Sequence, residues 1–314
     1  MTMTALPSFK QLQYLVALCD YRNFTRAAQA CFVTQSTLSA GLRELEGLLG
    51  VKLVERDRQT VVMTQVGLAT VSRARTLLAA ARDLVEVATG AGEPMSGLLR
   101  LGVIPTIAPF VLPAALQALQ KRYPKLQLGL REDLTANLLD RVSGGELDFA
   151  LIALPYDTGS LHVEPLFNDD LWLVGRKDAP ELQAKQMRIG AMLNKRLLLL
   201  EEGHCLREHA LAACKPSSRR STKGLEATSL LTLVQMIESG LGIGLIPEMA
   251  IRSGLVTSPK LLTRAITHPT LKRTIALVAR RSTARENELH ALADVMREVA
   301  AAGSDPTRHR LARH

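Results

Sequence analysis

The spacing of apolar residues changes near residue 90 of this 314-residue chain. Before that point, apolar residues recur at intervals of three and four, the period of an amphipathic helix. After it, short apolar runs alternate with helical stretches, a pattern typical of an α/β sheet. The stretch TGAGEPMSG (89–97) between them is small and broken by a proline, as linkers are. A single core stops growing near ~250–300 residues, so we expect two compact domains of α+β / α/β class.

The first 65 residues predict three helices and a hairpin. Apolar residues share one face in FKQLQYLVALCD and again in TRAAQACF, so Cys19 and Cys31 are expected to be packing residues. A third helix starts at a cap, Thr34 or Ser36, carries a leucine stripe and ends at Gly50. VKLVERDRQTVVM then places two apolar runs around a charged turn. Together these elements predict a winged helix-turn-helix.

The third helix opens with short polar side chains, which let a helix N-terminus approach phosphates and base edges. An ordinary capped surface helix is the alternative interpretation. The basic hairpin tip and the net charge of +9 favour DNA, a polyanion. The residues expected at DNA are Gln35, Ser36, Thr37, Ser39 and Arg43 on the helix, and Arg56 and Arg58 on the hairpin.

GLATVSRARTLLAAARDLVEVATGA predicts a long helix with more apolar positions than a DNA-binding head needs. A partner helix from a second copy is the obvious use for them. The resulting two-fold dimer would match a near-palindromic DNA site.

The succession FTRAAQACFVTQSTLSAGLRELEGLLGVKLVERD…TQVG resembles the LysR-type transcriptional regulators. In that family the positions matching Gln35, Ser36, Ser39 and Arg56 commonly lie at the DNA. The later alternation of strands and helices implies a two-subdomain α/β effector domain of periplasmic-binding-protein type, with a cleft suited to small ligands. The expected parts are a DNA-binding domain at 1–65, a linker helix and hinge at 66–95, and a regulatory domain at 96–314, with subdomain I at about 96–167 and 273–303 and subdomain II at about 168–272.

Several other classes lack support. No uncharged apolar run of ~18 residues and no secretory signal is present, so we expect a cytoplasmic protein without a membrane partner. The glycines of SGLGIGLIP end a helix and enter a strand, the reverse of a phosphate-binding loop. No GxSxG, zinc-protease or P-loop motif occurs. We therefore expect neither an enzyme nor a bound cofactor or metal.

The stretch EEGHCLREHALAACK holds Cys205 and Cys214, nine positions apart. On one continuous helix they would be separated by about 13.5 Å and face nearly opposite ways, whereas a disulfide needs Cα atoms within roughly 7 Å. The pair is therefore either two unrelated thiols or a switch whose oxidation breaks the helix. A metal site using His204 and His209 as further ligands is a third possibility, although its spacing is not a usual zinc pattern.

Local chemistry distinguishes the two thiols. Cys205 stands at the expected helix start, where the macrodipole, His204 and Arg207 favour a thiolate. The two glutamates of the preceding EEG, Glu201 and Glu202, oppose a thiolate because they are negatively charged. Cys214, at the helix end, has no such advantage and suits a resolving thiol better than an attacking one.

EEGHCLREHALAAC, together with MSGLLRLGVIPTIAPFVLP and EATSLLTLVQMIESGLGIGLIP, resembles the OxyR branch, the peroxide-sensing members of the LysR family. The resemblance implies that Cys205 is the peroxidatic cysteine and that Cys214 resolves it into an intramolecular disulfide. It also implies roles for other residues. Those expected to hold peroxide are Thr106, Thr135 and His204, and the one expected to favour the thiolate is Arg273. Glu226 stands where the branch often has a basic residue.

The sequence thus predicts a hydrogen-peroxide-responsive transcription factor. The resemblance implies a homo-tetramer, as a dimer of dimers, on promoter DNA, with RNA polymerase and a cellular dithiol reductant as partners. One alternative is a LysR-type regulator that senses a small metabolite in its cleft and has incidental cysteines. Another is a metal-binding or thiol-peroxidase protein with a vestigial DNA-binding head, which the intact recognition helix disfavours.

Overall fold

The computed structural model describes residues 6–56, 61–88, 94–183, 197–213, 225–266 and 271–303. The chain divides near Gly92 into two compact units, the first formed mainly by residues 1–92 and the second mainly by residues 93–314. No helix within the described ranges is long and apolar enough to cross a lipid bilayer.

The first unit is a winged helix-turn-helix, as predicted. Its elements are α1 (Phe9–Tyr21), α2 (Phe24–Ala30), α3 (Gln35–Leu49), the antiparallel strands β1 (Val54–Arg56) and β2 (Val61–Met63), and the long helix α4 (Gln65–Ala88). The caps are local: Asn23 accepts a hydrogen bond from the Arg26 amide, and Thr34 from the Thr37 amide. α3 ends at Gly50, whose φ of +68° is the left-handed conformation that glycine adopts without strain.

The apolar stripes of these helices meet in one core. Its fully buried members include Leu15, Leu18, Leu38, Leu45 and Leu53. Cys19 and Cys31 pack against this core from its edge and are only partly buried. Burial raises the pKa of both thiols, which fits the predicted packing role.

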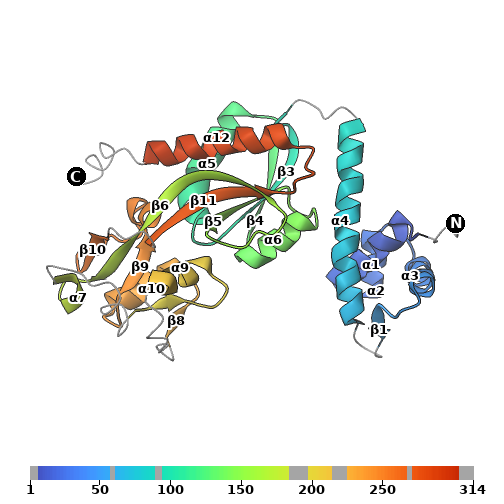
Figure 1. The fold of residues 1–314 in the computed structure, drawn as a ribbon, viewed down its shortest axis with the longest axis horizontal. Coiled ribbons are helices and arrows are strands. Elements are labelled where there is room, and N and C mark those ends of the chain that lie inside the picture. The colour runs from blue at the N-terminus through green and yellow to red at the C-terminus, as the bar shows by residue number, and fades with distance from the viewer. Residues whose placement is uncertain are drawn as a thin grey trace. The chain divides into compact units, whose positions relative to one another are not determined.

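The second unit is built on a mixed sheet. Three parallel strands form one half: β3 (Gly97–Val103) lies between β4 (Leu126–Glu132) and β5 (Phe149–Leu154). The strand β11 (Lys272–Ala279) returns antiparallel to β5. Figure 1 shows α12 (Glu286–Gly303) lying alongside α5 (Ala108–Arg122) and over β11, while α6 (Thr135–Ser143) follows β4.

The strand β6 (His162–Arg176) joins the two halves of this unit. Its residues 162–170 pair with β11, and its residues 171–176 pair with β9 (Gly244–Pro247) and β10 (Leu261–Ala265). Apolar spacing in the sequence indicates a strand only in its second part, DLWLVGR (170–176). The first part contains Pro165, and the register with β11 shifts between Ile275 and Ala276. A proline and a bulge interrupt the alternation by which strands are recognised.

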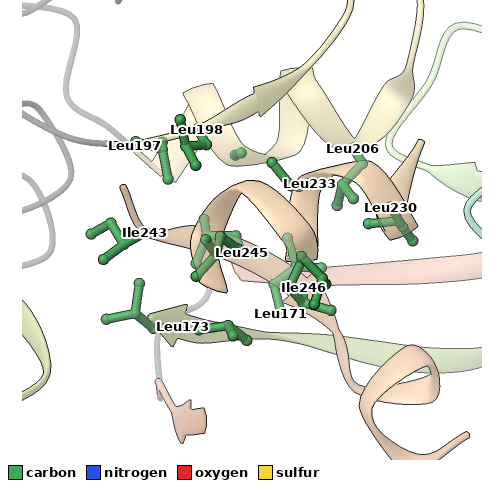
Figure 2. Close-up of a cluster of buried hydrophobic side chains, with 14 of the residues drawn as sticks. Leu171, Leu173, Leu197, Leu198, Leu206, Leu230, Leu233, Ile243, Leu245 and Ile246 are labelled. Atoms are coloured by element: carbon green, nitrogen blue, oxygen red, sulfur yellow. The ribbon is translucent and has the colours of Figure 1, made fainter. Parts of the chain in front are cut away.

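The other half of the unit packs short elements around an apolar cluster. These are α7 (Pro180–Gln183), β7 (Leu199–Leu200), α9 (Cys205–Ala213), β8 (Glu226–Ala227), α10 (Leu230–Glu238) and α11 (Glu248–Arg252). Figure 2 shows the cluster, where Leu206 of α9 and Leu233 of α10 meet Leu171 and Leu173 of β6 and Leu245 of β9. Because Leu206 is buried in this cluster, the start of α9 is anchored to the apolar core of this half. The predicted α/β effector fold is confirmed.

Candidate functional site

Cys205 is the first residue of α9 and is 3% exposed. The turn that leads into it depends on Gly203, whose φ is +96° and at which a Cβ would lie 2.8 Å from Leu134 Cδ1. Glycine therefore allows the chain to turn tightly beneath Leu134 and deliver the thiol to the interior.

A narrow pocket surrounds the thiol. It is lined by Ile104, Pro105, Thr106, Leu134, Thr135, Gly203, His204 and Cys205, and it leaves no free space as large as a water molecule. The family resemblance singled out Thr106, Thr135, His204 and Cys205, and the fold brings all four to this pocket from three separate segments of the chain.

Burial raises the pKa of Cys205, and this effect is opposed by groups that stabilise the thiolate. The positive charge of Arg273 lowers the pKa, and so do the nearby Thr135 hydroxyl and the backbone N–H groups of Leu206 and Cys205 itself. The two amides belong to the N-terminus of α9, where helix geometry points N–H groups at an anion. The predicted contribution of the helix start is thus present, but desolvation exceeds it.

Arg273 is buried and held from two sides. Its Nε donates to Asp169 Oδ2 at 2.9 Å, and its Nη1 donates to Thr106 Oγ1 at 2.9 Å. Its Nη2 donates to the Thr106 carbonyl at 3.1 Å and lies 2.8 Å from Asp169 Oδ2. A buried guanidinium of this kind needs a paired carboxylate. Arg273 therefore orients Thr106 directly and acts on Cys205 through its charge.

Two buried polar atoms in this region lack hydrogen-bond partners within the described part of the chain: Thr135 Oγ1 and His209 Nδ1. The Thr135 hydroxyl is nevertheless near enough to Cys205 to stabilise its thiolate. His209 follows Cys205 by four residues on α9, and its Nε2 contacts the Pro155 carbonyl at 3.3 Å. Unsatisfied buried groups of this kind are often found where a water or a substrate binds.

Both histidines near the thiol, His204 and His209, have surroundings that favour the uncharged imidazole. Burial lowers the pKa of His204, with Glu201 opposing, and burial together with the charge of Arg273 lowers the pKa of His209. Sequence reasoning considered His209 only as a metal ligand, although its spacing from Cys205 already placed both on one helical face. Nothing in the sequence indicated Tyr156, which is next to Pro155. Its pKa is raised, first by burial and then by the charge of Cys205, which indicates that it lies near the thiol.

Arg207 does not support the thiolate in the way that its closeness in sequence suggested. Its Nη1 donates to Glu226 Oε1 at 2.7 Å and to the Leu200 carbonyl at 2.8 Å. Glu226, which replaces an often basic residue of the branch, is therefore the ion-pair partner of Arg207.

Cys214, the predicted resolving thiol, lies outside the described residues. Within them, no cluster of three or more His, Cys, Asp or Glu side chains is arranged to hold a metal.

Five of the predicted DNA-contacting residues lie on α3, four of them in its first five positions. Gln35, Ser36, Thr37 and Arg43 are exposed and Ser39 is half-buried. Thr34 contacts the hydroxyls of both Ser36 and Thr37 at 2.8 Å, and Gln35 accepts from Thr25 at 3.2 Å, so the first turn is ordered by its own polar groups. Arg56 is the last residue of β1, where the structure describes only its backbone. Arg58 lies outside the described residues.

Comparison with known proteins places both units in one family. Residues 9–68 match the bacterial regulatory helix-turn-helix protein family of lysR type, and residues 92–301 match the LysR substrate binding domain. The HTH-type transcriptional regulator EstR of Acinetobacter baylyi is 45% identical over 301 residues, covering 95% of this chain and 99% of that protein.

Two solved structures are similar over nearly the whole length. A full-length OxyR variant from Pseudomonas aeruginosa is 33% identical, with a TM-score of 0.76, covering 93% of this chain and 98% of that one. A hydrogen-peroxide-bound OxyR variant from Corynebacterium glutamicum is 32% identical, with a TM-score of 0.62, covering 95% and 96%. The chain therefore belongs to the LysR family of DNA-binding transcriptional regulators and is an OxyR-like member of it.

Proposed function

We propose that this chain is a hydrogen-peroxide sensor that controls transcription through its DNA-binding head, and that it is not an enzyme. The observation that carries the proposal is the Cys205 pocket, where a buried thiol at a helix N-terminus meets two threonine hydroxyls, an imidazole and the field of Arg273. The peroxide-bound OxyR neighbour supports the same ligand for this pocket.

The reaction would proceed in two balanced steps. The Cys205 thiolate attacks one peroxide oxygen, the O–O bond breaks, and sulfenic acid forms while hydroxide leaves and takes up a proton to become water. The Cys214 thiol then attacks the sulfenic sulfur, forming a disulfide and releasing a second water. The sulfurs lose two electrons in total, and peroxide gains them.

The side chains around the thiol have distinct proposed roles. Thr106 is oriented by Arg273 and would accept from or donate to peroxide through its hydroxyl. Thr135 has a hydroxyl that is unpartnered within the described chain and would bind the second oxygen, while neutral His204 would stabilise the departing hydroxide. The pocket has no water-sized space, so peroxide entry requires a small local opening.

The helix α9 would convert oxidation of Cys205 into a change in the surface of the regulatory unit. The helix spans nine residues, Cys205–Ala213, and so begins at the first thiol and ends one residue before Cys214; a bond between the two would require this helix to unwind. Leu206 would then leave the cluster shown in Figure 2. The changed surface would repack a tetramer on promoter DNA and alter contact with RNA polymerase, and a cellular dithiol would restore the reduced form.

Peptide mapping tests this function. Reduced protein treated with one equivalent of peroxide should yield a Cys205–Cys214 disulfide peptide and an altered DNA-binding pattern. Cys205→Ser should abolish both, whereas Cys31→Ser, a matched change in the first unit, should abolish neither. If both thiols stay free and DNA binding is unchanged, the metabolite-sensing alternative replaces the proposal.

A second variant tests the pocket itself. Thr135→Val keeps the side-chain shape and breaks no hydrogen bond seen in the described chain, yet it removes a donor to the thiolate. A hydrogen bond to a charged group contributes about 1.5–3 kcal/mol, so stopped-flow oxidation should slow by roughly ten-fold or more. An unchanged rate would remove Thr135 from the site.

A further inference from the structure

The segment that contains both thiols of the proposed switch is closed by two short strands. The strand β7 precedes the first thiol and β8 follows the second, and the strands pair in parallel, with Leu199 opposite Glu226 and Leu200 opposite Ala227. The Glu201 amide extends this pairing by donating to the Ala227 carbonyl at 3.0 Å. The β7–β8 pair is therefore a fixed base for the helix α9, which lies between the two strands in the chain.

One side chain of α9 is bound to both strands of this base. Arg207, the third residue of α9, donates from Nη1 to the Leu200 carbonyl of β7 at 2.8 Å and to Glu226 Oε1 of β8 at 2.7 Å. The side chain of Arg207 is 16% exposed and that of Glu226 is 38% exposed, so the ion pair is partly shielded from water. We call the contacts of Arg207 with Glu226 and the Leu200 carbonyl the α9 latch.

The latch stands in the part of the chain that a disulfide would rearrange. Ala213, the last residue of α9 and the neighbour of Cys214, lies about 12 Å along the helix axis from Cys205. A disulfide needs its two Cα atoms within roughly 7 Å, so the turns of α9 must unwind. Arg207 belongs to the first of these turns. Unwinding removes the backbone geometry that aims its guanidinium at both strands.

The latch is separate from the chemistry at the first thiol. Neither Arg207 nor Glu226 is among the described residues that line the Cys205 pocket. Burial raises the pKa of Cys205, and the charge of Arg273, the Thr135 hydroxyl and the amides at the start of α9 lower it. A change in the latch should therefore leave the attack on peroxide unaltered and act on the step that follows.

We propose that the α9 latch holds the helix in its reduced form and thereby sets the rate at which Cys214 captures the sulfenic acid of Cys205. This inference rests on the function proposed above. In the capture step the Cys214 sulfur attacks the Cys205 sulfur, the S–S bond forms, the S–O bond breaks, and the hydroxyl leaves with the thiol proton as water. Arg207 and Glu226 are positioning residues, because they act on this step only through α9.

Two changes at Glu226 weaken the latch to different extents. Glu226→Arg places like charges together, and Glu226→Gln removes the ion pair but keeps an acceptor. At peroxide concentrations where capture limits the reaction, quenched-flow alkylation with peptide mapping measures disulfide formation. Partly exposed ion pairs contribute modestly, so Glu226→Gln should speed capture about two-fold and Glu226→Arg about five-fold. Glu202→Gln, the same loss of charge at an exposed glutamate before α9, should leave the capture rate unchanged.

The first step of the reaction is measured separately. In the Cys214→Ser protein, where capture cannot occur, dimedone traps the sulfenic acid as it forms. Glu226→Arg in this background should leave the rate of sulfenic acid formation unchanged. A parallel increase in both rates would overturn the proposal, because the change would then act on Cys205 itself.

Exchanging the two charges distinguishes the ion pair from general destabilisation. Arg207→Glu alone should speed capture, as Glu226→Arg does. The double variant Arg207→Glu with Glu226→Arg restores opposite charges and should return the capture rate to within about two-fold of the wild type. A double variant as fast as either single variant would show that the ion pair does not hold α9.

Amide hydrogen exchange of the fully reduced protein tests the latch without peroxide. Glu226→Arg should speed exchange in the α9 peptide about three-fold or more and leave exchange in α12 unchanged. If α9 exchanges faster but peroxide yields no disulfide in the wild type, the sensing function fails while the latch on α9 stands. If the wild type forms the disulfide but Glu226→Arg does not alter α9 exchange, the latch fails while the sensing function stands.

Discussion

At the scale of single residues, the chemistry around Cys205 is set by burial and by the charges and donors that burial brings close. The sequence placed the thiol correctly at a helix start, but it could not reveal that desolvation outweighs the helix terminus. Arg207 shows why closeness in sequence misleads: two positions along a helix is a turn of about 200°, and the side chain reaches Glu226 instead. His209, four positions along, returns to the face of Cys205.

The backbone conformation of Phe32 is also not predictable from the sequence, for a different reason. Phe32, in the turn between α2 and α3, has a φ of +55° and is 96% exposed. Bulky residues rarely adopt that left-handed conformation, so no pattern of apolar spacing indicates it. Two backbone hydrogen bonds hold this turn: the Phe32 N–H donates to the Gln29 carbonyl, and the Val33 N–H donates to the Ala28 carbonyl.

His209 makes the stability of the regulatory unit depend on acidity. Its side chain is 5% exposed, and burial with the charge of Arg273 lowers its pKa below the ordinary 6.5. Below pH 6.5 the unfolded chain therefore binds a proton that the folded chain excludes, so stability is present at neutral pH and is lost as pH falls. For one group that stays neutral when folded, the loss between pH 7.5 and 5.5 is at most about 1.4 kcal/mol.

His209→Gln should reduce this acid loss, because glutamine can still donate to the Pro155 carbonyl but does not titrate. Urea unfolding at pH 7.5 and 5.5, followed by the fluorescence of Trp172 in β6, reports on the regulatory unit alone because the chain has one tryptophan. His290→Gln, on the exposed side of α12, is the control. An equal acid loss in the wild type and His209→Gln would show that the buried imidazole is not responsible.

At the scale of elements, the sequence predicted the winged head and the α/β alternation, but only the second part of the crossing strand that organises the site. β6 runs through both halves of the regulatory unit, and Asp169 and Trp172 lie on it only three residues apart. Because Arg273 on β11 pairs with Asp169 in register, the two strands bring a buried cation and its carboxylate together from positions more than a hundred residues apart. Apolar spacing carries no record of such a pairing, whereas the family resemblance did single out Arg273.

Removing one partner of the Asp169–Arg273 pair should lower the free energy of unfolding much more than removing both partners. Arg273→Met leaves Asp169, 3% exposed, without its partner, and a broken buried pair costs about 3–5 kcal/mol. The double variant Asp169→Asn with Arg273→Met removes both charges and should recover at least half of the loss. Urea unfolding monitored at Trp172 measures both.

The double variant separates stability from reactivity. It lacks the positive charge that lowers the pKa of Cys205, so its thiol should react with peroxide more slowly even where its fold is restored. Additive destabilisation by the two changes would contradict a paired role for Asp169 and Arg273.

At the scale of the whole molecule, the first unit presents an apolar surface on α4 that a single copy does not cover. The composition gave a net charge of +9 but could not locate it, and the family match assigns the head to DNA. The helix α4 carries Val66, Leu77 and Leu84 on one face, because intervals of seven and eleven residues return to nearly the same direction. These side chains are 51%, 53% and 70% exposed, which is unusual for an aligned apolar stripe.

We predict that a second copy covers this stripe, making α4 the dimer contact. Leu84→Asp places a charge within that contact, where it would be desolvated without a partner. Sedimentation velocity should therefore show a shift toward monomer, with dimer dissociation at least a hundred-fold easier. Ser72→Asp, an exposed change about 120° around the same helix from Leu84, should leave the assembly intact. If Leu84→Asp sediments like the wild type, α4 does not hold the dimer, and the pairing of DNA-binding heads must come from contacts between regulatory units.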